Sequence, residues 1–295
     1  NQLSIIITIP YIASIFTQDN FGIFSQAIVF IQITWIVSEW GLGNYSINIF
    51  PKSKKEQFIL FLELNSMILF IAVLFAIILF FIISIIETGI NNKLFFILLI
   101  SFVFGGLNPL WFFQAQLRPK ILIAPTIISR LFFVICVFTF IKNDQDIYLY
   151  FFLNGLIFIF IFCYSIIFLN KEGLFFKLIS PSKIFYHIQS SIDFFLSSLF
   201  GNQFASIWMF VFTLNSSPYL IAIYAIGDHF LRAINMASNI IANVIWANYK
   251  KNSINRNQLF FIGILILLSI PILWFLIKPL VQLFFNENFD QSIII

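Results

Sequence analysis

Residues 219–250 read YLIAIYAIGDHFLRAINMASNIIANVIWANYK, and this stretch carries the strongest signal for fold and function. Most of it is apolar enough for lipid, yet charged residues lie far from its ends. At 100° per residue, five polar residues share an arc of about 80° on one helix face: Asp228, Arg232, Asn235, Asn239 and Asn243. A charge at the bilayer centre costs roughly 2.5–3.5 kcal/mol on insertion scales. The face must therefore point to other helices or to a hydrated cavity, and it predicts one wall of a polar path through a membrane protein.

The composition of the chain predicts an integral membrane protein. Its 295 residues are 61% hydrophobic and 9% charged, whereas a soluble domain carries about 25% charged residues. The apolar runs are long and do not alternate, so they are interpreted as helices rather than barrel strands. The expected class is an all-α polytopic membrane protein. Cys136 and Cys163 both lie inside apolar runs, so neither a disulfide nor a metal site is predicted.

Nine spanning helices and the start of a tenth are predicted, because one span needs about 20 apolar residues. Their approximate ranges are 1–15, 23–48, 58–86, 94–114, 121–141, 147–169, 184–213, 219–248 and 258–284, with the tenth beginning at Ser292. Residues 17–22 are expected to form the first loop. The longest connection, Asn170 to Lys183, divides a six-helix N-terminal lobe, residues 1–176, from a partial second lobe, residues 177–295. Both ends of the chain look cut, so it is interpreted as a fragment of a longer protein.

The loop charges support this arrangement. Basic residues gather in the connections after the second, fourth, sixth and eighth predicted helices: Lys52, Lys54, Lys55, Arg118, Lys120, Lys171, Lys177, Lys183, Lys250, Lys251 and Arg256. The alternate connections carry Lys93 and Lys142 among several acids. Basic loops stay in the cytoplasm, which predicts a cytoplasmic N-terminus. Topology thus explains the basic residues, and nucleic-acid binding does not follow from the net charge of +4.

Polar residues on other predicted helices extend the polar path. Ionisable groups inside a membrane are functional candidates, because placing a charged side chain in lipid costs free energy that a function would explain. Gln32 and Glu39 lie seven residues apart on one stripe of the second helix, Arg130 lies a third of the way along the fifth, and Asp193 lies on the seventh. Pro109 is expected to kink the fourth helix, because it removes a backbone hydrogen bond.

Simpler interpretations stand beside these. In one alternative interpretation, Asp228 and Arg232, which are four residues apart, only neutralise each other as a buried ion pair. That interpretation leaves the three asparagines of the same helix face unexplained. Glu63 is interpreted as snorkelling near its helix end, and His187 as structural.

The chain carries no signature of a soluble enzyme. It has no Gly-rich phosphate loop, zinc-binding motif or nucleophile elbow. No catalytic residue, metal or cofactor is predicted, and the protein is not expected to be an enzyme.

Six short segments occur in a recognisable order: Ile9-Pro-Tyr-Ile12, Asn20-Phe-Gly22, Glu39-Trp-Gly-Leu-Gly-Asn44, Pro109-Leu-Trp-Phe-Phe-Gln114, Ile128-Ser-Arg130 and the run from Tyr148 to Gly155. Together with the charged segment from Asp228 to Arg232, they resemble bacterial polysaccharide flippases of the O-antigen (Wzx/RfbX) type. These belong to the multidrug/oligosaccharidyl-lipid/polysaccharide (MOP) exporter superfamily. The resemblance spans nearly the whole chain. Where the family often has Asp ahead of the glycine motif, this chain has Glu39.

The resemblance implies two helical bundles that form a V and open to either side of the membrane. The implied substrate is an undecaprenyl-diphosphate-linked oligosaccharide repeat unit of O-antigen or capsule, moved across the bacterial inner membrane. Membrane lipids and other polysaccharide-assembly membrane proteins are the expected partners. Cations suit the diphosphate and neutral amides suit the sugars. Arg130 and Arg232 would thus contact the diphosphate, and Gln32 and the three asparagines would contact the sugars.

Three other interpretations stay open. A cation-coupled multidrug exporter of the same superfamily would need acids more than arginines in its cavity, and both occur here. A membrane-bound polymerase or glycosyltransferase would be expected to have a large outer loop with arginines, which the predicted loops lack. The third is a non-functional fragment of an interrupted gene.

Overall fold

The computed structural model describes residues 2–86, 89–171, 180–202 and 204–229, and its regular structure in these ranges is helical. In chain order the elements are α1 (Gln2–Ile15), α2 (Gln18–Glu39), α3 (Leu42–Ile49), α4 (Lys54–Ile85), α5 (Asn92–Gly106), α6 (Leu110–Ala115), η1 (Pro119–Leu122), α7 (Ile123–Phe140), η2 (Asp144–Asp146), α8 (Ile147–Lys171), α9 (Pro181–Ser190), α10 (Ile192–Asn202) and α11 (Phe204–Asn215). Residues 218–229 form a further helix. The all-α prediction is confirmed for the part of the chain that the structure describes.

Within the described residues, five helical segments are long and apolar enough to cross a membrane: Gln18–Ile49, Lys54–Ile85, Asn92–Ala115, Pro119–Phe140 and Asp144–Leu169. They coincide with predicted helices two to six, and they support the membrane-protein class. Large apolar side chains on their outer faces are exposed, such as Phe81 at 59% and Phe132 at 62%. The predicted total of nine spans and the start of a tenth reaches beyond the described residues and stays a prediction, as does the division into two lobes near residue 176.

The expected loop over residues 17–22 is wrong, because α2 begins at Gln18. The backbone N–H of Thr17 donates to Asp144 Oδ1 at 2.8 Å, and the N–H of Phe21 donates to the Thr17 carbonyl, also at 2.8 Å. Asp19 lies in the first turn, where a carboxylate is favoured by the positive end of the helix dipole. The polar residues that looked like a loop are therefore a helix start.

The predicted second helix is also interrupted. α2 ends at Glu39, and Trp40 and Gly41 have φ of +46° and +69° before α3 begins at Leu42. An added Cβ on Gly41 would lie 2.6 Å from the backbone of Phe194. Only glycine fits there without strain, because both the positive φ and the close approach exclude a side chain. The break is therefore built around a contact between residues far apart in the chain.

The kink expected at Pro109 is confirmed as a complete break. α5 ends at Gly106, and α6 begins at Leu110 with Pro109 as its N-cap. Proline lacks the backbone N–H that would continue the helical ladder.

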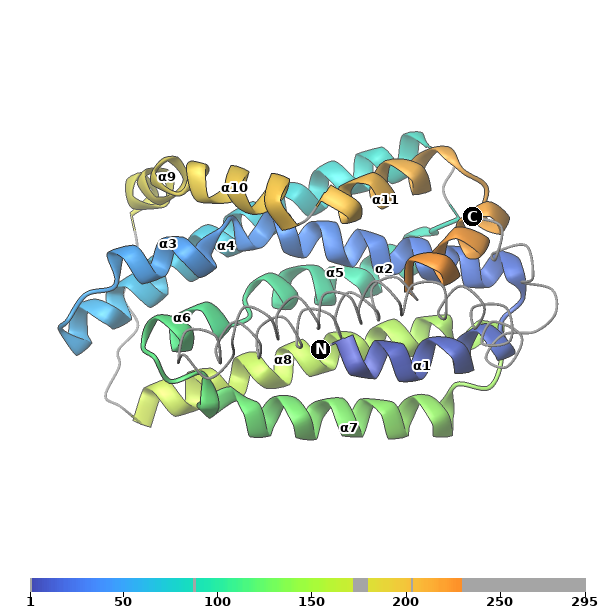
Figure 1. The fold of residues 1–295 in the computed structure, drawn as a ribbon, viewed down its shortest axis with the longest axis horizontal. Helices are drawn as coiled ribbons and strands as arrows, with labels where there is room; N and C mark the ends of the chain where they lie inside the picture. The colour runs from blue at the N-terminus through green and yellow to red at the C-terminus, as the bar shows by residue number, and fades with distance from the viewer. Residues whose placement is uncertain (1, 87–88, 172–179, 203, 230–295) are drawn as a thin grey trace, which may run out of the picture.

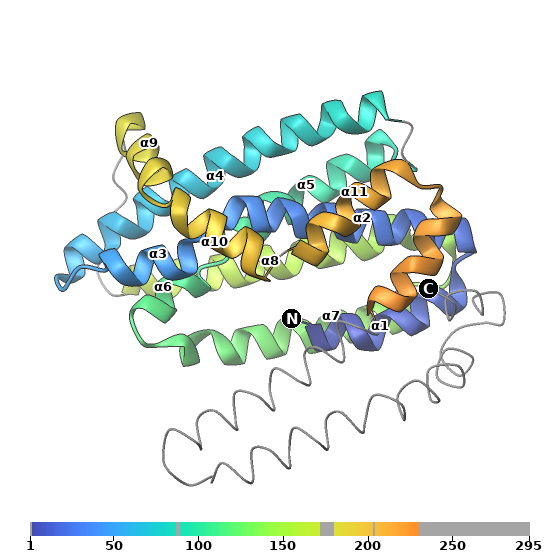
Figure 2. The ribbon, with the colours of Figure 1, turned by 45° about the horizontal axis from the view of Figure 1, so that its top comes forward.

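The helices run side by side in an elongated bundle (Figure 1). α5 packs along α8, and α2 contacts α4, α5 and α11. Toward one end, the rings of Phe24, Tyr150 and Phe133 pack with centroids 4.7 and 5.2 Å apart. Toward the other end, Phe61 and Phe112 join α4 to α6 with ring centroids 4.9 Å apart. Figure 2 shows α9, α10 and α11 lying over the bundle, and they contact α4, α3 and α2 respectively.

Candidate functional site

Arg130 of α7 is a buried cation inside the helical bundle. It is 9% exposed, and its guanidinium carbon lies 5.5 Å from the centroid of the Phe158 ring on α8. Its Nε has no hydrogen-bond partner, and no acidic side chain in the described ranges forms an ion pair with it. A cation over an aromatic face recovers only part of the cost of leaving water. The site is therefore suited to receive an anion.

The Phe158 ring is a meeting point for four helices. Its centroid lies 6.2 Å from that of Trp35 on α2. A Cβ placed on Gly105 of α5 would be 4.0 Å from the same ring. Arg130 therefore lies on the α7 side of a junction formed by α2, α5, α7 and α8.

Several polar atoms on these helices are buried without a hydrogen-bond partner. They are the hydroxyl oxygens of Ser25 and Ser101 and the amide oxygens of Gln32 and Asn154. Ser101 Oγ would lie 3.4 Å from a Cβ placed on Gly155, the residue after Asn154. A buried polar atom without a hydrogen bond lowers stability by about 1–3 kcal/mol. Such atoms therefore favour a ligand that supplies the missing hydrogen bonds. Hydroxyl and amide groups are the types that bind sugar hydroxyls.

The other predicted path residues lie in different environments. Gln32 is half-buried on α2, and Asp228 is half-buried in the helix over residues 218–229. Glu39 and Asp193 are exposed, at the end of α2 and on α10, so they do not share the buried setting of Arg130. The remaining residues of the predicted polar wall lie outside the described residues: Arg232, Asn235, Asn239 and Asn243. In the described ranges, no group of three His, Cys, Asp or Glu side chains is placed to hold a metal.

A second polar cluster joins α3, α4 and α9. The Glu63 carboxylate is buried on α4. It accepts a hydrogen bond from Lys183 Nζ through Oε1, and its Oε2 lies 3.1 Å from His187 Nε2. Tyr45 OH on α3 is 2.9 Å from His187 Nδ1. Because both carboxylate oxygens have partners, the cost of burying Glu63 is offset.

The break after α2 adds an aromatic contact beside this cluster. The Trp40 ring stacks on Phe195 of α10 with centroids 4.1 Å apart and an interplanar angle of 5°. Trp40 Nε1 donates to the Ile188 carbonyl at 3.2 Å. Together with Gly41, these residues join α2 and α3 to α9 and α10. The Glu39–Asn44 motif therefore connects segments on either side of the predicted lobe boundary.

Sequence reasoning missed the cluster around Glu63. It assigned Glu63 to snorkelling and His187 to a structural role, without seeing that the two side chains bind each other. One signal was present: Glu63 lies near the predicted cytoplasmic end of its helix, and Lys183 and His187 lie near the predicted cytoplasmic end of theirs. An acid and a base at similar predicted depth on two apolar helices are candidates for pairing.

Comparison with known proteins identifies one family. A family model described as "Polysaccharide biosynthesis protein" matches residues 1–246, which include every helix that the structure describes and the charged stretch from Asp228 to Asn243. No curated protein and no solved structure matches the chain.

Proposed function

Because the chain belongs to the polysaccharide biosynthesis protein family, we propose that it is a flippase for a lipid-linked oligosaccharide. The family match and the five apolar helices support a polysaccharide transporter. The finer proposal is that the substrate is an oligosaccharide repeat unit joined through a diphosphate to undecaprenol. The protein moves this head group from the inner to the outer leaflet of the bacterial inner membrane.

The buried state of Arg130 is the observation that carries the proposal. A diphosphate head group crossing a membrane needs a cation that is not already neutralised by an acid. Arginine suits this role, since its planar guanidinium binds two phosphate oxygens at once and keeps its charge when buried. The unpaired amides and hydroxyls on α2, α5 and α8 provide neutral partners for the sugar part of the same head group.

Transport by alternating access also requires contacts that open and close. The Glu63–Lys183–His187 cluster and the Trp40–Phe195 stack join segments before and after residue 176. We place the closed end of the path at these contacts, on the predicted cytoplasmic side. The substrate head group would enter only after α4 and α9 separate.

The test replaces Arg130 in the full-length protein, expressed in cells that depend on it for surface polysaccharide. Arg130→Ala is expected to abolish surface polysaccharide and to leave lipid-linked repeat units in the inner leaflet. Arg130→Lys is expected to retain part of the activity, because the charge stays but the two-point contact is lost. Lys93→Ala is the matched control, since Lys93 is an exposed cation 4.5 Å from the Tyr148 ring centroid.

Normal surface polysaccharide with Arg130→Ala, at a normal protein level, would overturn the proposal. Loss of drug or dye resistance without any change in polysaccharide would instead favour the multidrug exporter.

A further inference from the structure

An apolar groove of about 350 Å³ lies between α7 and α8, which run side by side along one edge of the bundle (Figure 1). Its lining is apolar apart from Ser129. Phe133 of α7 and Ile157 of α8 are the buried part of the lining, and Phe132 and Phe160 are exposed at 62% and 47%. Exposed apolar side chains on spanning helices belong in lipid. The groove therefore opens toward the hydrocarbon of the bilayer.

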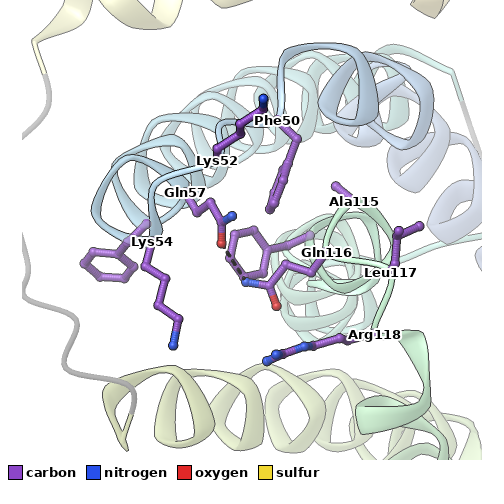
Figure 3. A pocket seen from close by; sticks show the side chains of 10 residues that line it. Phe50, Lys52, Lys54, Gln57, Ala115, Gln116, Leu117 and Arg118 are labelled. Atoms are coloured by element: carbon purple, nitrogen blue, oxygen red, sulfur yellow. Dashed lines mark hydrogen bonds between the residues drawn. The ribbon is translucent and has the colours of Figure 1, made fainter.

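The groove differs in chemistry from a cavity of about 310 Å³ between α4 and the end of α6 (Figure 3). Lys52 and Lys54 line part of that cavity, and Gln116 Nε2 donates to Gln57 Oε1 at 3.3 Å across it. Covering charged and amide groups with hydrocarbon removes their hydration and costs free energy. A hydrocarbon chain therefore suits the groove between α7 and α8 and does not suit that cavity.

Arg130 lies behind the groove, on the inner side of the same two helices. At 100° per residue, Arg130 lies about 130° around α7 from the centre of the face that lines the groove. Phe158, whose ring meets the Arg130 guanidinium at 5.5 Å, lies about 150° around α8 from the corresponding face. Ser129 and Ile157, which line the groove, are the chain neighbours of this pair. One helix contact thus separates a buried cation from an apolar groove at the same level.

The depth of this level selects among lipids. Arg130 is seven residues after the start of α7, which is about 11 Å along the helix axis. The phosphate of a phospholipid at rest in the bilayer stays in the interfacial layer outside the hydrocarbon core. A lipid whose head group is being carried across the membrane brings its phosphate to the level of Arg130, while its hydrocarbon chain remains in the bilayer beside the groove.

We propose that the polyprenyl chain of the transported lipid lies in the groove between α7 and α8 while its diphosphate contacts Arg130. The link between chain and head group passes between the two helices beside Ser129, the smallest of the lining side chains. The Ser129 hydroxyl donates to the Thr126 carbonyl of its own helix at 3.0 Å, so this bond does not tie α7 to α8. The inference rests on the proposed function and adds the place where the lipid chain is held.

The experiment identifies which lipid lies in the groove by photocrosslinking. The full-length protein is placed in nanodiscs of dioleoyl phosphatidylglycerol that contain a known fraction of undecaprenyl diphosphate. The photoreactive amino acid p-benzoylphenylalanine replaces either Phe132, which lines the groove, or Leu74, an exposed residue of α4 that does not line it. Mass spectrometry gives the ratio of the two crosslinked lipids at each position. The share of undecaprenyl diphosphate should be about tenfold higher at Phe132 than at Leu74.

Two substitutions test how this preference arises. Arg130→Ala should lower the share at Phe132 to the value at Leu74, because the head group loses its partner. Leu156→Trp should lower the share as well, since the larger side chain fills the groove from α8, and it should reduce surface polysaccharide in cells. Leu74→Trp is the matched control and should leave both measurements unchanged.

Equal lipid ratios at Phe132 and Leu74 would overturn the proposal, because the groove would then hold whatever lipid surrounds the protein. A covalent dimer at Phe132 would assign the groove to a second copy, and a crosslink within the chain would assign it to another segment of this protein; either result overturns the lipid assignment. A preference that survives Arg130→Ala would refute the link between the groove and the interior cation.

Failure of this inference and failure of the proposed function give different results. Equal ratios, together with loss of surface polysaccharide in Arg130→Ala, would remove the groove and keep the flippase. A preference at Phe132 that depends on Arg130, together with normal surface polysaccharide in Arg130→Ala, would keep the groove as a lipid site and remove the proposed function.

Discussion

Glu63 Oε2 lies 3.1 Å from His187 Nε2, although 124 positions separate the two residues in the chain. Both side chains are buried, at 7% and 6% exposure of the residues. A buried acid and base stabilise a helix contact only when each finds its partner, since an unpaired charge in that setting is strongly unfavourable. The pair therefore holds α4 against α9 and makes the strength of that contact sensitive to either side chain.

Glu63→Gln is expected to loosen the contact between α4 and α9. The amide keeps the shape of the carboxylate but loses the charge that attracts Lys183 and the second acceptor oxygen. Labelling of Ser191→Cys by a membrane-permeant thiol reagent measures the change, because Ser191 is buried next to α9. The labelling rate should rise several-fold in a background where Cys136 and Cys163 are replaced by serine.

Glu56→Gln is the control for this measurement, because Glu56 is an exposed acid near the start of the same helix. It should leave the labelling of Ser191→Cys unchanged. An equal rise in both variants would show that the Glu63 cluster does not hold the contact.

The sequence allowed the apolar helices to be predicted well, since hydropathy over about 20 residues reports directly on burial in lipid. The break at Pro109 was also predictable, because the missing N–H is a covalent property of proline. The break at Trp40 and Gly41 was not, because it depends on the backbone of Phe194 and on the Phe195 ring. Hydropathy carries no information about such distant contacts.

The candidate site likewise has a part that the sequence predicted and a part that it did not. Arg130 was identified because placing a cation in an apolar membrane helix costs free energy and therefore indicates a functional role. In the structure it is buried beside Phe158. The pairing of Glu63 with His187 escaped prediction, since periodicity within one helix does not specify which face meets which distant helix. The exposure of Glu39 and Asp193 escaped it for the same reason.

Tyr45→Phe is expected to lower the free energy of unfolding by about 0.5–1.5 kcal/mol, the usual net value of one hydrogen bond. The substitution removes the OH that lies 2.9 Å from His187 Nδ1 and keeps the ring. Denaturant unfolding in detergent micelles measures the change. In a His187→Ala background the same substitution should have almost no effect, since its partner is gone. A full effect in that background would mean that the Tyr45 OH stabilises the protein through a group other than His187.

Gly41→Ala is expected to cost about 1–3 kcal/mol of stability, because alanine at a φ of +69° is strained and its Cβ would approach the Phe194 backbone to 2.6 Å. The thermal unfolding temperature of the purified protein should fall accordingly. Gly43→Ala serves as the comparison, since a Cβ there would contact only Glu39 Oε1, at 3.6 Å. Equal melting temperatures for the two variants would contradict the close contact between Gly41 and α10.

Phe158→Leu is expected to reduce transport by less than Arg130→Ala does. Leucine keeps an apolar side chain at the junction of α2, α5, α7 and α8 but removes the ring that faces the guanidinium at 5.5 Å. A cation–π contact of this kind contributes about 0.5–2 kcal/mol, so its loss lets Arg130 take other orientations without removing its charge. Phe158→Tyr, which keeps the ring, should transport more than Phe158→Leu.

Phe162→Leu, one turn along α8, removes a ring that faces Phe104 and should spare transport. If Phe162→Leu and Phe158→Leu reduce transport equally, the effect belongs to packing along α8 and not to the orientation of Arg130.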